Sequence, residues 1–270
     1  MPRIITVDDP LDPRLAAYRN VRERDLVGRQ GRFIAEGEVV LRGLIARAAH
    51  RTESVLVAAK RLAGLADALA GLPEGVPVYV AGQAAMDAVV GFPIHRGVLA
   101  VGVRAPPRSA DEILAGLGDG ALVLVLMGLS NHDNVGGAFR NAAAFGAGAV
   151  ILDAGCCDPL YRKAIRVSVG ASLTTPFAVL AAGEDPVDGL TRAGFTPIAL
   201  SPAAAAPLSQ ATRPARTALL LGTEGPGLPA DVLARCETVS IPMAEGFDSL
   251  NVAAAGAVAL HHFRFVAAGR

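Results

Sequence analysis

The sequence has no tryptophan, few aromatic residues (4%) and only three cysteines. Cys156 and Cys157 are adjacent and Cys236 stands alone, so the cysteines have neither the number nor the spacing of a disulfide framework or a zinc site. The five histidines are scattered along the chain. We therefore expect no bound metal, and we interpret the cysteines as small buried side chains of a protein in a reducing cytoplasm.

Long hydrophobic runs are missing as well. Hydrophobic residues make up 52% of the 270 residues, which is enough for one large domain or two ordinary domains with their own cores. The longest apolar stretches, such as 121–127 and 252–260, fall well short of the roughly 20 residues that a membrane span needs. Residues 1–10 lack the basic leader and apolar core of a secretory signal. We expect a soluble cytoplasmic protein with no membrane partner.

The chain has no net excess of either charge, because 25 Lys and Arg residues balance 25 Asp and Glu residues. The balance is uneven along the sequence: from Arg14 to Arg61 there are eleven basic residues and five acidic ones. Most of the basic residues are arginines, which pair with phosphate through two hydrogen bonds and stack on bases. This local excess is compatible with RNA binding and equally with a solvated surface.

The first hundred residues alternate between helical and strand patterns. Apolar residues recur at helical spacing from Val40 to Ala48. Three short stretches have the composition of buried strands, namely 53–58, 76–81 and 97–104. The paired prolines of RAPPRSADE (104–112) then end the pattern. We predict an α/β domain of residues 1–105 followed by a second domain of residues 106–270.

The second domain alternates strands and helices more regularly. Buried strands are predicted at 121–127, 149–152, 196–200, 217–221 and 238–241. Helices are predicted at 135–145, 186–194, just after Pro229, and at 250–267. This order implies a parallel sheet covered by helices on both faces. The pattern alone favours an unknotted doubly wound fold, because connections in proteins almost never thread loops.

A first candidate functional stretch begins at Asn134 and ends near Arg140. Gly136 and Gly137 lie one turn before Arg140. Helical side chains lean toward the N-terminus, so the Arg140 side chain passes over a surface without side chains and can reach outward to a ligand. Its neighbours are apolar, and an arginine in such company needs an anionic or carbonyl partner. A structural salt bridge is the alternative.

A second candidate stretch is the loop GTEGPG (222–227), which contains Glu224 and three glycines. The glycines are not in the G-x-G-x-x-G order of a dinucleotide-binding turn, and no long helix follows the loop at once. Glycine allows the backbone to approach a flat adenine and ribose closely. The loop SPAAAAPL (201–208) is expected to pass near the same ligand site.

A third candidate stretch runs from Ile241 and Met243 to Ser249, Leu250 and Asn251. Ser249 has the residue type of an N-cap and is predicted to begin the last helix. That helix consists almost entirely of Ala, Gly and Val over nine residues. Another helix can therefore approach it very closely, and we interpret it as a core helix at a subunit interface.

In their order and spacing these three stretches resemble the motifs of the SpoU (TrmH-type) RNA ribose methyltransferases of the SPOUT superfamily. The resemblance implies a trefoil-knotted parallel-sheet catalytic domain in place of the unknotted fold, S-adenosylmethionine as cofactor, and a homodimer formed through the C-terminal domain. It assigns catalytic roles to Asn134, Arg140, Glu224, Ser249 and Asn251, with Glu224 orienting Arg140. It assigns cofactor binding to Leu221, Gly222, Gly225, Gly227, Ile241, Met243, Ser249 and Leu250.

Two other stretches resemble parts of the same family. FIAEG (33–37) and the helix after it are similar to the substrate-binding domain that precedes the catalytic domain in many SpoU enzymes, so the first domain is expected to bind RNA. YRKAIRVSVGA (161–171) could contact the RNA backbone or form a solvated basic turn. It is similar to the family stretch that would include Arg166, Ser168 and Gly170. The chain departs from the family at Asn131 and His132, where an X-Pro pair is frequent.

The predicted activity is methylation of a ribose 2′-hydroxyl in ribosomal or transfer RNA. A hydroxyl is a poor nucleophile near neutral pH, so the site must supply a base or stabilise the developing alkoxide. Arginine keeps its proton at neutral pH, which favours Arg140 as a positioning group over Arg140 as the base. A catalytically silent RNA-binding or ribosome-assembly factor and a nucleotide-dependent oxidoreductase are the alternatives. The motifs leave open which RNA is the substrate, and whether it is free or assembled into a particle.

Overall fold

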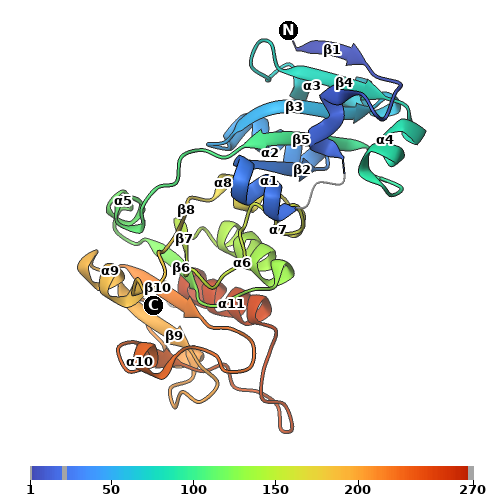
Figure 1. Cartoon of the computed structure of the whole chain (residues 1–270). Coiled ribbons are helices and arrows are strands. Elements are labelled where there is room, and N and C mark those ends of the chain that lie inside the picture. The colour runs from blue at the N-terminus through green and yellow to red at the C-terminus, as the bar shows by residue number, and fades with distance from the viewer. Residues whose placement is uncertain (1, 20–22, 267–270) are drawn as a thin grey trace. The chain divides into compact units, whose positions relative to one another are not determined.

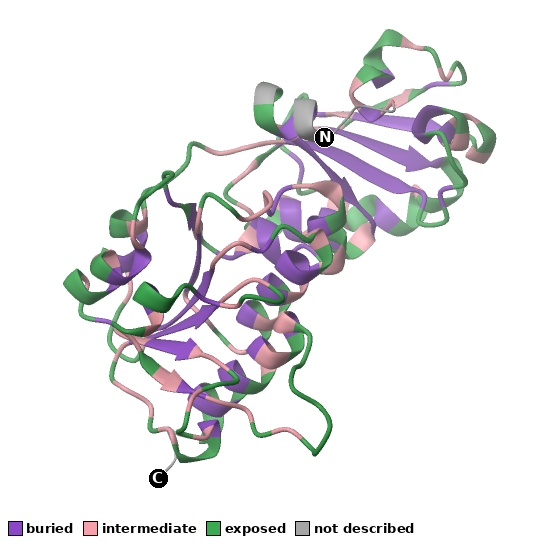
Figure 2. Cartoon of the chain, turned by 60° about the horizontal axis from the view of Figure 1, so that its bottom comes forward, coloured by how far each residue is buried: buried purple, intermediate pink, exposed green. Residues whose placement is uncertain are grey.

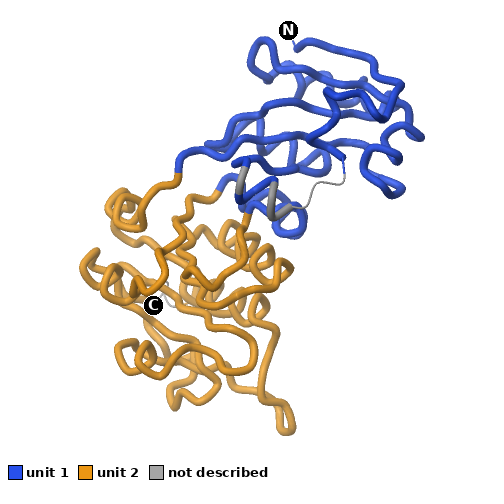
Figure 3. Tube along the Cα trace, in the orientation of Figure 1, with its two compact units in different colours: residues 1–106, 160–174 blue, residues 107–159, 175–270 orange. Residues whose placement is uncertain are grey.

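A computed structural model describes residues 2–19 and 23–266 (Figure 1). The chain separates into two compact units (Figure 3). Unit 1 comprises Met1–Pro106 and Leu160–Thr174, and unit 2 comprises Pro107–Pro159 and Thr175–Arg270. Each unit has its own sheet, and the buried residues lie mainly in the strands and on the helix faces that pack against them (Figure 2). No helix within the described ranges is long and apolar enough to cross a membrane.

Unit 1 is built on a five-stranded mixed sheet. Its strands are β1 (Arg3–Thr6), β2 (Arg32–Glu36), β3 (Arg51–Ala58), β4 (Pro77–Ala81) and β5 (Val98–Val103), in the spatial order β1-β4-β3-β5-β2. The β1, β4 and β3 strands run parallel, whereas β5 is antiparallel to both β3 and β2. The predicted strands at 53–58, 76–81 and 97–104 correspond to β3, β4 and β5. The sequence patterns did not identify β1, which is short and largely exposed, or β2.

Helices cover the sheet of unit 1. They are α1 (Glu23–Gln30), α2 (Glu38–Arg47), α3 (Ala66–Leu69), α4 (Gln83–Val90), α7 (Arg162–Val167) and α8 (Ala171–Thr174), with 3-10 turns η1 (Pro13–Tyr18), η2 (Ala59–Arg61) and η3 (Ala63–Leu65). One core cluster joins Leu15 of η1, Leu26 of α1 and Met86 of α4 to the strands. The apolar repeat that begins at Val40 is α2, and it buries Val40 and Leu44.

Unit 2 is built on a six-stranded sheet in which every neighbouring pair is parallel. Its strands are β6 (Leu122–Leu126), β7 (Ala149–Leu152), β8 (Phe177–Val179), β9 (Thr196–Leu200), β10 (Thr217–Leu221) and β11 (Glu237–Val239), in the order β11-β9-β10-β6-β7-β8. The predicted parallel sheet is confirmed. The β8 strand was not predicted, because three residues are too few to produce a recognisable pattern.

The sheet of unit 2 has helices on both faces, as predicted. They are α5 (Ala110–Ala115), α6 (His132–Ala144), α9 (Pro186–Arg192), α10 (Ala230–Leu233) and α11 (Val252–His261), with a 3-10 turn η4 (Leu208–Gln210) and a π-helical turn η5 (His262–Val266). The α5, α9 and α10 helices share one core cluster with the strands. The α6 and α11 helices pack together on the other face (Figure 1). The last helix begins two residues later than predicted.

The segment Leu160–Thr174 belongs to unit 1, although the predicted boundary assigned it to the second domain. In unit 1, α7 packs on β2 and α8 packs on α2. An ion pair holds the segment there, because the Arg162 Nε donates to the Glu36 Oε2 at 3.0 Å. The side chains of Glu36 and Arg162 are only 8% and 21% exposed. A single boundary placed along the sequence cannot show that a later segment packs back into the first unit.

We predict that Arg162→Ala lowers the free energy of unfolding by about 2–3 kcal/mol, because it leaves the Glu36 carboxylate buried without its cation. Arg32→Ala is the matched control in the same unit. Arg32 pairs with Glu53 at 2.9 Å, but these side chains are 39% and 28% exposed, so the expected loss is less than about 1 kcal/mol. Urea unfolding followed by circular dichroism measures both. Equal losses in the two variants would contradict the assigned role of Arg162.

Candidate active site

One cavity of about 370 Å³ lies at the carboxyl ends of β9, β10 and β11, which are neighbours in the sheet of unit 2. Ligands of parallel sheets bind at this edge. The loops after these strands line the cavity, and they include 201–203, which the sequence placed near the ligand. All eight residues predicted to bind the cofactor are in the lining: Leu221, Gly222, Gly225, Gly227, Ile241, Met243, Ser249 and Leu250.

The glycine loop after β10 folds back on itself. The Gly227 backbone N–H donates to the Thr223 carbonyl at 3.1 Å. A Cβ on Gly222 would lie 2.4 Å from the Gly227 carbonyl carbon and the Leu228 nitrogen, which is closer than any side chain allows. Gly225 and Gly227 have φ of +91° and +73°, in the left-handed region that favours glycine. The glycine spacing therefore has a steric cause in the loop itself.

Three predicted catalytic side chains form one hydrogen-bond network, and one of them, Glu224, lines this cavity. The Asn134 Nδ2 donates to the Glu224 Oε1 at 2.6 Å. The Asn251 Nδ2 donates to the Asn134 Oδ1 at 2.8 Å and to the Glu224 Oε1 at 3.4 Å. Asn134 is 6% exposed, so both polar ends of its amide are bonded in a buried place. The network joins the loop after β10 to the starts of α6 and α11.

Asn251, and not Ser249, is the N-cap of α11. Its Oδ1 accepts from the backbone N–H groups of Ala253 and Ala254. The prediction for Ser249 was wrong because Asn is an equally good cap and lies one residue before the first helical turn. The Ser249 hydroxyl instead donates to the Asp248 Oδ1 at 3.2 Å. Asp248 also lines the cavity, and no signal in the sequence distinguished it from other loop aspartates.

Arg140 stands apart from the network. It is exposed on α6, and within the described part of the chain its guanidinium has neither an ion-pair nor a hydrogen-bond partner. The structural salt bridge considered as an alternative is therefore not found there. Glu224 bonds to Asn134 and Asn251 and makes no hydrogen bond or ion pair with Arg140 within the described residues, so its orienting role toward Arg140 stays a prediction. Arg140 comes six positions after Asn134 in α6, so their side chains leave the helix axis about 120° apart.

Small residues let α11 approach both α6 and β10. A Cβ on Gly137 would lie 2.9 Å from the Ala253 Cβ, and one on Gly256 would lie 2.7 Å from the Leu221 Cδ1. The Asn141 Nδ2 also donates to the Ala253 carbonyl at 2.7 Å. The helix that approaches α11 is thus α6 of the same chain. The Ala and Gly composition therefore serves contacts within unit 2, and the subunit interface stays a prediction.

The stretch 161–171 lies in unit 1, and most of its predicted residues have local structural contacts. Ser168 is 1% exposed and its hydroxyl donates to the Ile165 carbonyl at 3.0 Å. Gly170 has φ of +82° and packs against Val40. Arg166 is exposed on α7 and keeps open the hypothesis of an RNA contact.

The cysteines of unit 2 are not poised as nucleophiles. Burial raises the pKa of the Cys156 thiol to about 12 and the pKa of the Cys157 thiol to about 11. Both therefore stay protonated at neutral pH, while thiolate is the reactive form. The Cys156 Sγ instead donates to the Leu126 carbonyl at 3.3 Å. Among the residues that the structure describes, no group of three or more His, Cys, Asp or Glu side chains could hold a metal ion.

Comparison with known proteins adds to this geometry. Residues 121–261 match the family model described as the SpoU rRNA Methylase family. The chain is 41% identical over 265 residues to an uncharacterized tRNA/rRNA methyltransferase of Mycobacterium tuberculosis, covering 94% of this chain and 90% of that protein. It is 31% identical over 188 residues to the 23S rRNA (guanosine-2′-O-)-methyltransferase RlmB of Ralstonia nicotianae, covering 69% and 76% of the two chains.

Solved structures share the architecture of both units. A crystal structure of an RNA 2′-O ribose methyltransferase superposes with a TM-score of 0.77 at 26% identity, covering 96% of this chain and 98% of that one. The crystal structure of an rRNA methyltransferase of Sinorhizobium meliloti with bound AdoMet superposes with a TM-score of 0.80. It covers 97% of both chains but is only 20% identical, so it supports the fold alone.

We predict that Gly222→Ala lowers the free energy of unfolding by about 2–3 kcal/mol, because the added methyl group meets backbone atoms that cannot move independently. Gly256→Ala is the matched control. Its added methyl group meets only the end of the Leu221 side chain, which can change rotamer, so we expect a loss of about 1 kcal/mol. Thermal unfolding monitored by calorimetry compares the two. A Gly222→Ala protein as stable as the wild type would disprove the close approach of Gly222 to the backbone of Gly227 and Leu228.

Proposed function

Because this chain belongs to the SpoU rRNA methylase family, we propose that it transfers a methyl group from S-adenosylmethionine to a ribose 2′-hydroxyl of RNA. The observation that carries the proposal is the hydrogen-bond network of Asn134, Glu224 and Asn251. It joins one residue from each of the three motif stretches, and one of them, Glu224, lines the cavity. The names of the relatives favour ribosomal RNA, with transfer RNA as the other substrate class.

The lining of the cavity suits the proposed cofactor. Leu221, Ile241, Met243 and Leu250 provide apolar walls for a flat adenine, as small-molecule sites require. A Cβ on Gly225 or Gly227 would meet no atom within 4 Å, so the glycine loop offers bare backbone to a ligand. S-adenosylmethionine would supply a methyl group on a positively charged sulfur. The residues of this chain must then bring the ribose oxygen in line with that group.

Arg140 is proposed to position the ribose. Its exposed guanidinium has no partner among the described residues, so its N–H groups can bind a phosphate and the 2′-hydroxyl of a docked nucleotide. Asn134 and Asn251 would hold Glu224 in place, with Ser249 completing the site. Oxygen Oε2 of Glu224 takes no part in the network and is proposed to accept the hydrogen bond of the ribose hydroxyl.

Other features of the family are proposed for this chain as well. The chain beyond Thr196 would form the trefoil knot around the cofactor. Residues 1–105, together with 160–174, would bind the RNA substrate. A homodimer would form through unit 2, where Val258 and Phe265 are 45% and 58% exposed next to the α6 helix.

Labelled S-adenosylmethionine and RNA from a strain lacking the gene provide the direct test. We expect label in one RNA class at an alkali-resistant linkage, because a methylated 2′-oxygen cannot attack the neighbouring phosphate. S-adenosylhomocysteine at a hundred times its dissociation constant should also stabilise the protein by about 2.7 kcal/mol, whereas NAD should not. Stabilisation by NAD alone would favour an oxidoreductase. Cofactor binding without transfer to RNA or to ribosomal particles would favour a silent RNA-binding factor.

Arg140 variants separate positioning from base catalysis. We expect Arg140→Ala to reduce methyl transfer by about 10²-fold or more, since it loses both the charge and the fork of hydrogen bonds. Arg140→Lys should remain nearly as poor, because lysine cannot form the fork although it deprotonates more easily. Isothermal titration with S-adenosylhomocysteine should give wild-type affinity for both. Substantial activity of Arg140→Lys would count against positioning, and loss of cofactor binding would move Arg140 into the cofactor site.

A further inference from the structure

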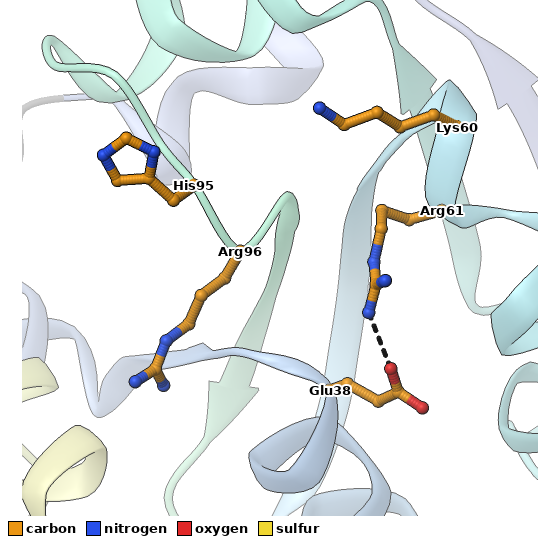
Figure 4. Close-up of a pocket in the computed structure, with 5 residues that line it drawn as sticks. All are labelled: Glu38, Lys60, Arg61, His95 and Arg96. Atoms are coloured by element: carbon orange, nitrogen blue, oxygen red, sulfur yellow. Dashed lines mark hydrogen bonds and ion pairs between the residues drawn. The ribbon is translucent and has the colours of Figure 1, made fainter.

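Unit 1 contains a second, open cavity of about 510 Å³ that the proposed function leaves without a role (Figure 4). Five residues line it: Glu38, Lys60, Arg61, His95 and Arg96. Three of the five are Lys or Arg residues and one is a glutamate, in a chain whose net charge is zero. The positive charge is therefore concentrated locally.

Glu38 does not neutralise Lys60 or Arg96, because Arg61 and Arg42 already bind its carboxylate. The Glu38 Oε2 accepts from the Arg61 Nη2 at 2.7 Å (Figure 4). The Glu38 Oε1 accepts from the Nε and Nη2 of Arg42, both at 3.0 Å. These pairs also hold Arg61 in place. Neither Lys60 nor Arg96 has an ion-pair or hydrogen-bond partner within the described ranges of the chain.

Arg96 lies over the turn that joins β2 to α2. A Cβ on Gly37 would lie 3.1 Å from the Arg96 Nη1 and 3.2 Å from its Cδ. Gly37 has φ of +101° and is the N-cap of α2, with no side chain to bond the first N–H groups of the helix. These groups and the helix dipole favour an anion. The FIAEG stretch thus ends in a bare turn beside a guanidinium without a partner.

Lys60 approaches from a different element. It lies on η2, and its side chain extends toward the loop that carries His95 (Figure 4). Arg61 and Arg96 lie on the two sides of the space, so cations from two segments, η2 and the loop that carries His95, face it. The cavity is open rather than enclosed. A phosphate within a continuing chain can enter an open site, whereas an isolated small metabolite is normally bound by burial.

We propose that this cavity binds a backbone phosphate of the RNA, with Lys60 and Arg96 as its principal contacts. This rests on the proposed function, which supplies RNA as the polyanion. Such a contact adds affinity and fixes the position of the substrate without reading its sequence. It also gives a local role to part of the arginine-rich region from Arg14 to Arg61. Other cations there, including Arg32 and Arg42, are used in internal ion pairs, and the side chains of Arg22, Arg24 and Arg29 lie outside the described part.

The test is the affinity for protein-free bacterial 23S rRNA, measured by filter binding at several salt concentrations. For the double variant Lys60→Ala with Arg96→Gln we expect at least a tenfold rise in Kd and a salt slope shallower by about 0.7–0.9 for each lost phosphate contact. Arg47→Ala is the matched control. Arg47 is an exposed arginine at the opposite end of α2, about 15 Å away, and should leave Kd and slope within twofold of wild type.

Three further measurements show whether the double variant has lost RNA affinity alone. S-adenosylhomocysteine binding and kcat at saturating RNA should stay at wild-type levels in the double variant, while KM for RNA rises with Kd. Wild-type Kd and salt slope in the double variant would overturn the proposal. So would saturable binding of inorganic pyrophosphate at this site that leaves rRNA affinity unchanged, since it would identify a small phosphate ligand. Failure of methyl transfer by the wild type would refute the proposed function, while the comparison of Kd values would still test the cavity.

Discussion

The buried amide of Asn134 is the interaction on which the candidate site depends. Its nitrogen donates to Glu224 and its oxygen accepts from Asn251, so one side chain ties together residues that are 90 and 117 positions away in the sequence. The parallel sheet makes this possible, because β6 and β10 are neighbours and their carboxyl ends meet at one edge. A buried amide whose two ends are both bonded holds its partners in one arrangement. Glu224, which lines the cavity, is therefore held in one position.

Close approach of backbone is the second constraint on the same site. Gly222, Gly137 and Gly256 each occupy a place where a Cβ would meet another atom at less than 3 Å. They bring the loop after β10, α6 and α11 together around the cavity. The glycine pattern that suggested contact with a ligand therefore serves packing first, and the ligand would meet the glycines at 225 and 227. In the proposed function, packing uses Gly222, whereas the cofactor would meet the other two glycines of the same loop.

The turn after β2 shows how unit 1 combines structure with a charged cavity. Glu36 is buried and pairs with Arg162, which returns to unit 1 from later in the chain. Glu38, two residues on, pairs with Arg42 and Arg61 on the surface. Gly37 between them has no side chain and leaves room for Arg96. The carboxylates of Glu36 and Glu38 thus hold arginines in place, and the positive charge of the cavity that they do not pair with faces solvent.

The sequence by itself determined the local features of this protein. Hydrophobic runs located β7, β9 and β10 at their observed bounds, and the three motif stretches identified the family and the loops of the cavity. These features depend on neighbouring residues, so a local pattern contains them. Only the tertiary structure decided the partners: Asn251 as the cap, Glu224 bonded to Asn134, and Leu160–Thr174 packed in unit 1. Such pairings join residues far apart in sequence, and no local pattern specifies which of several polar side chains will meet.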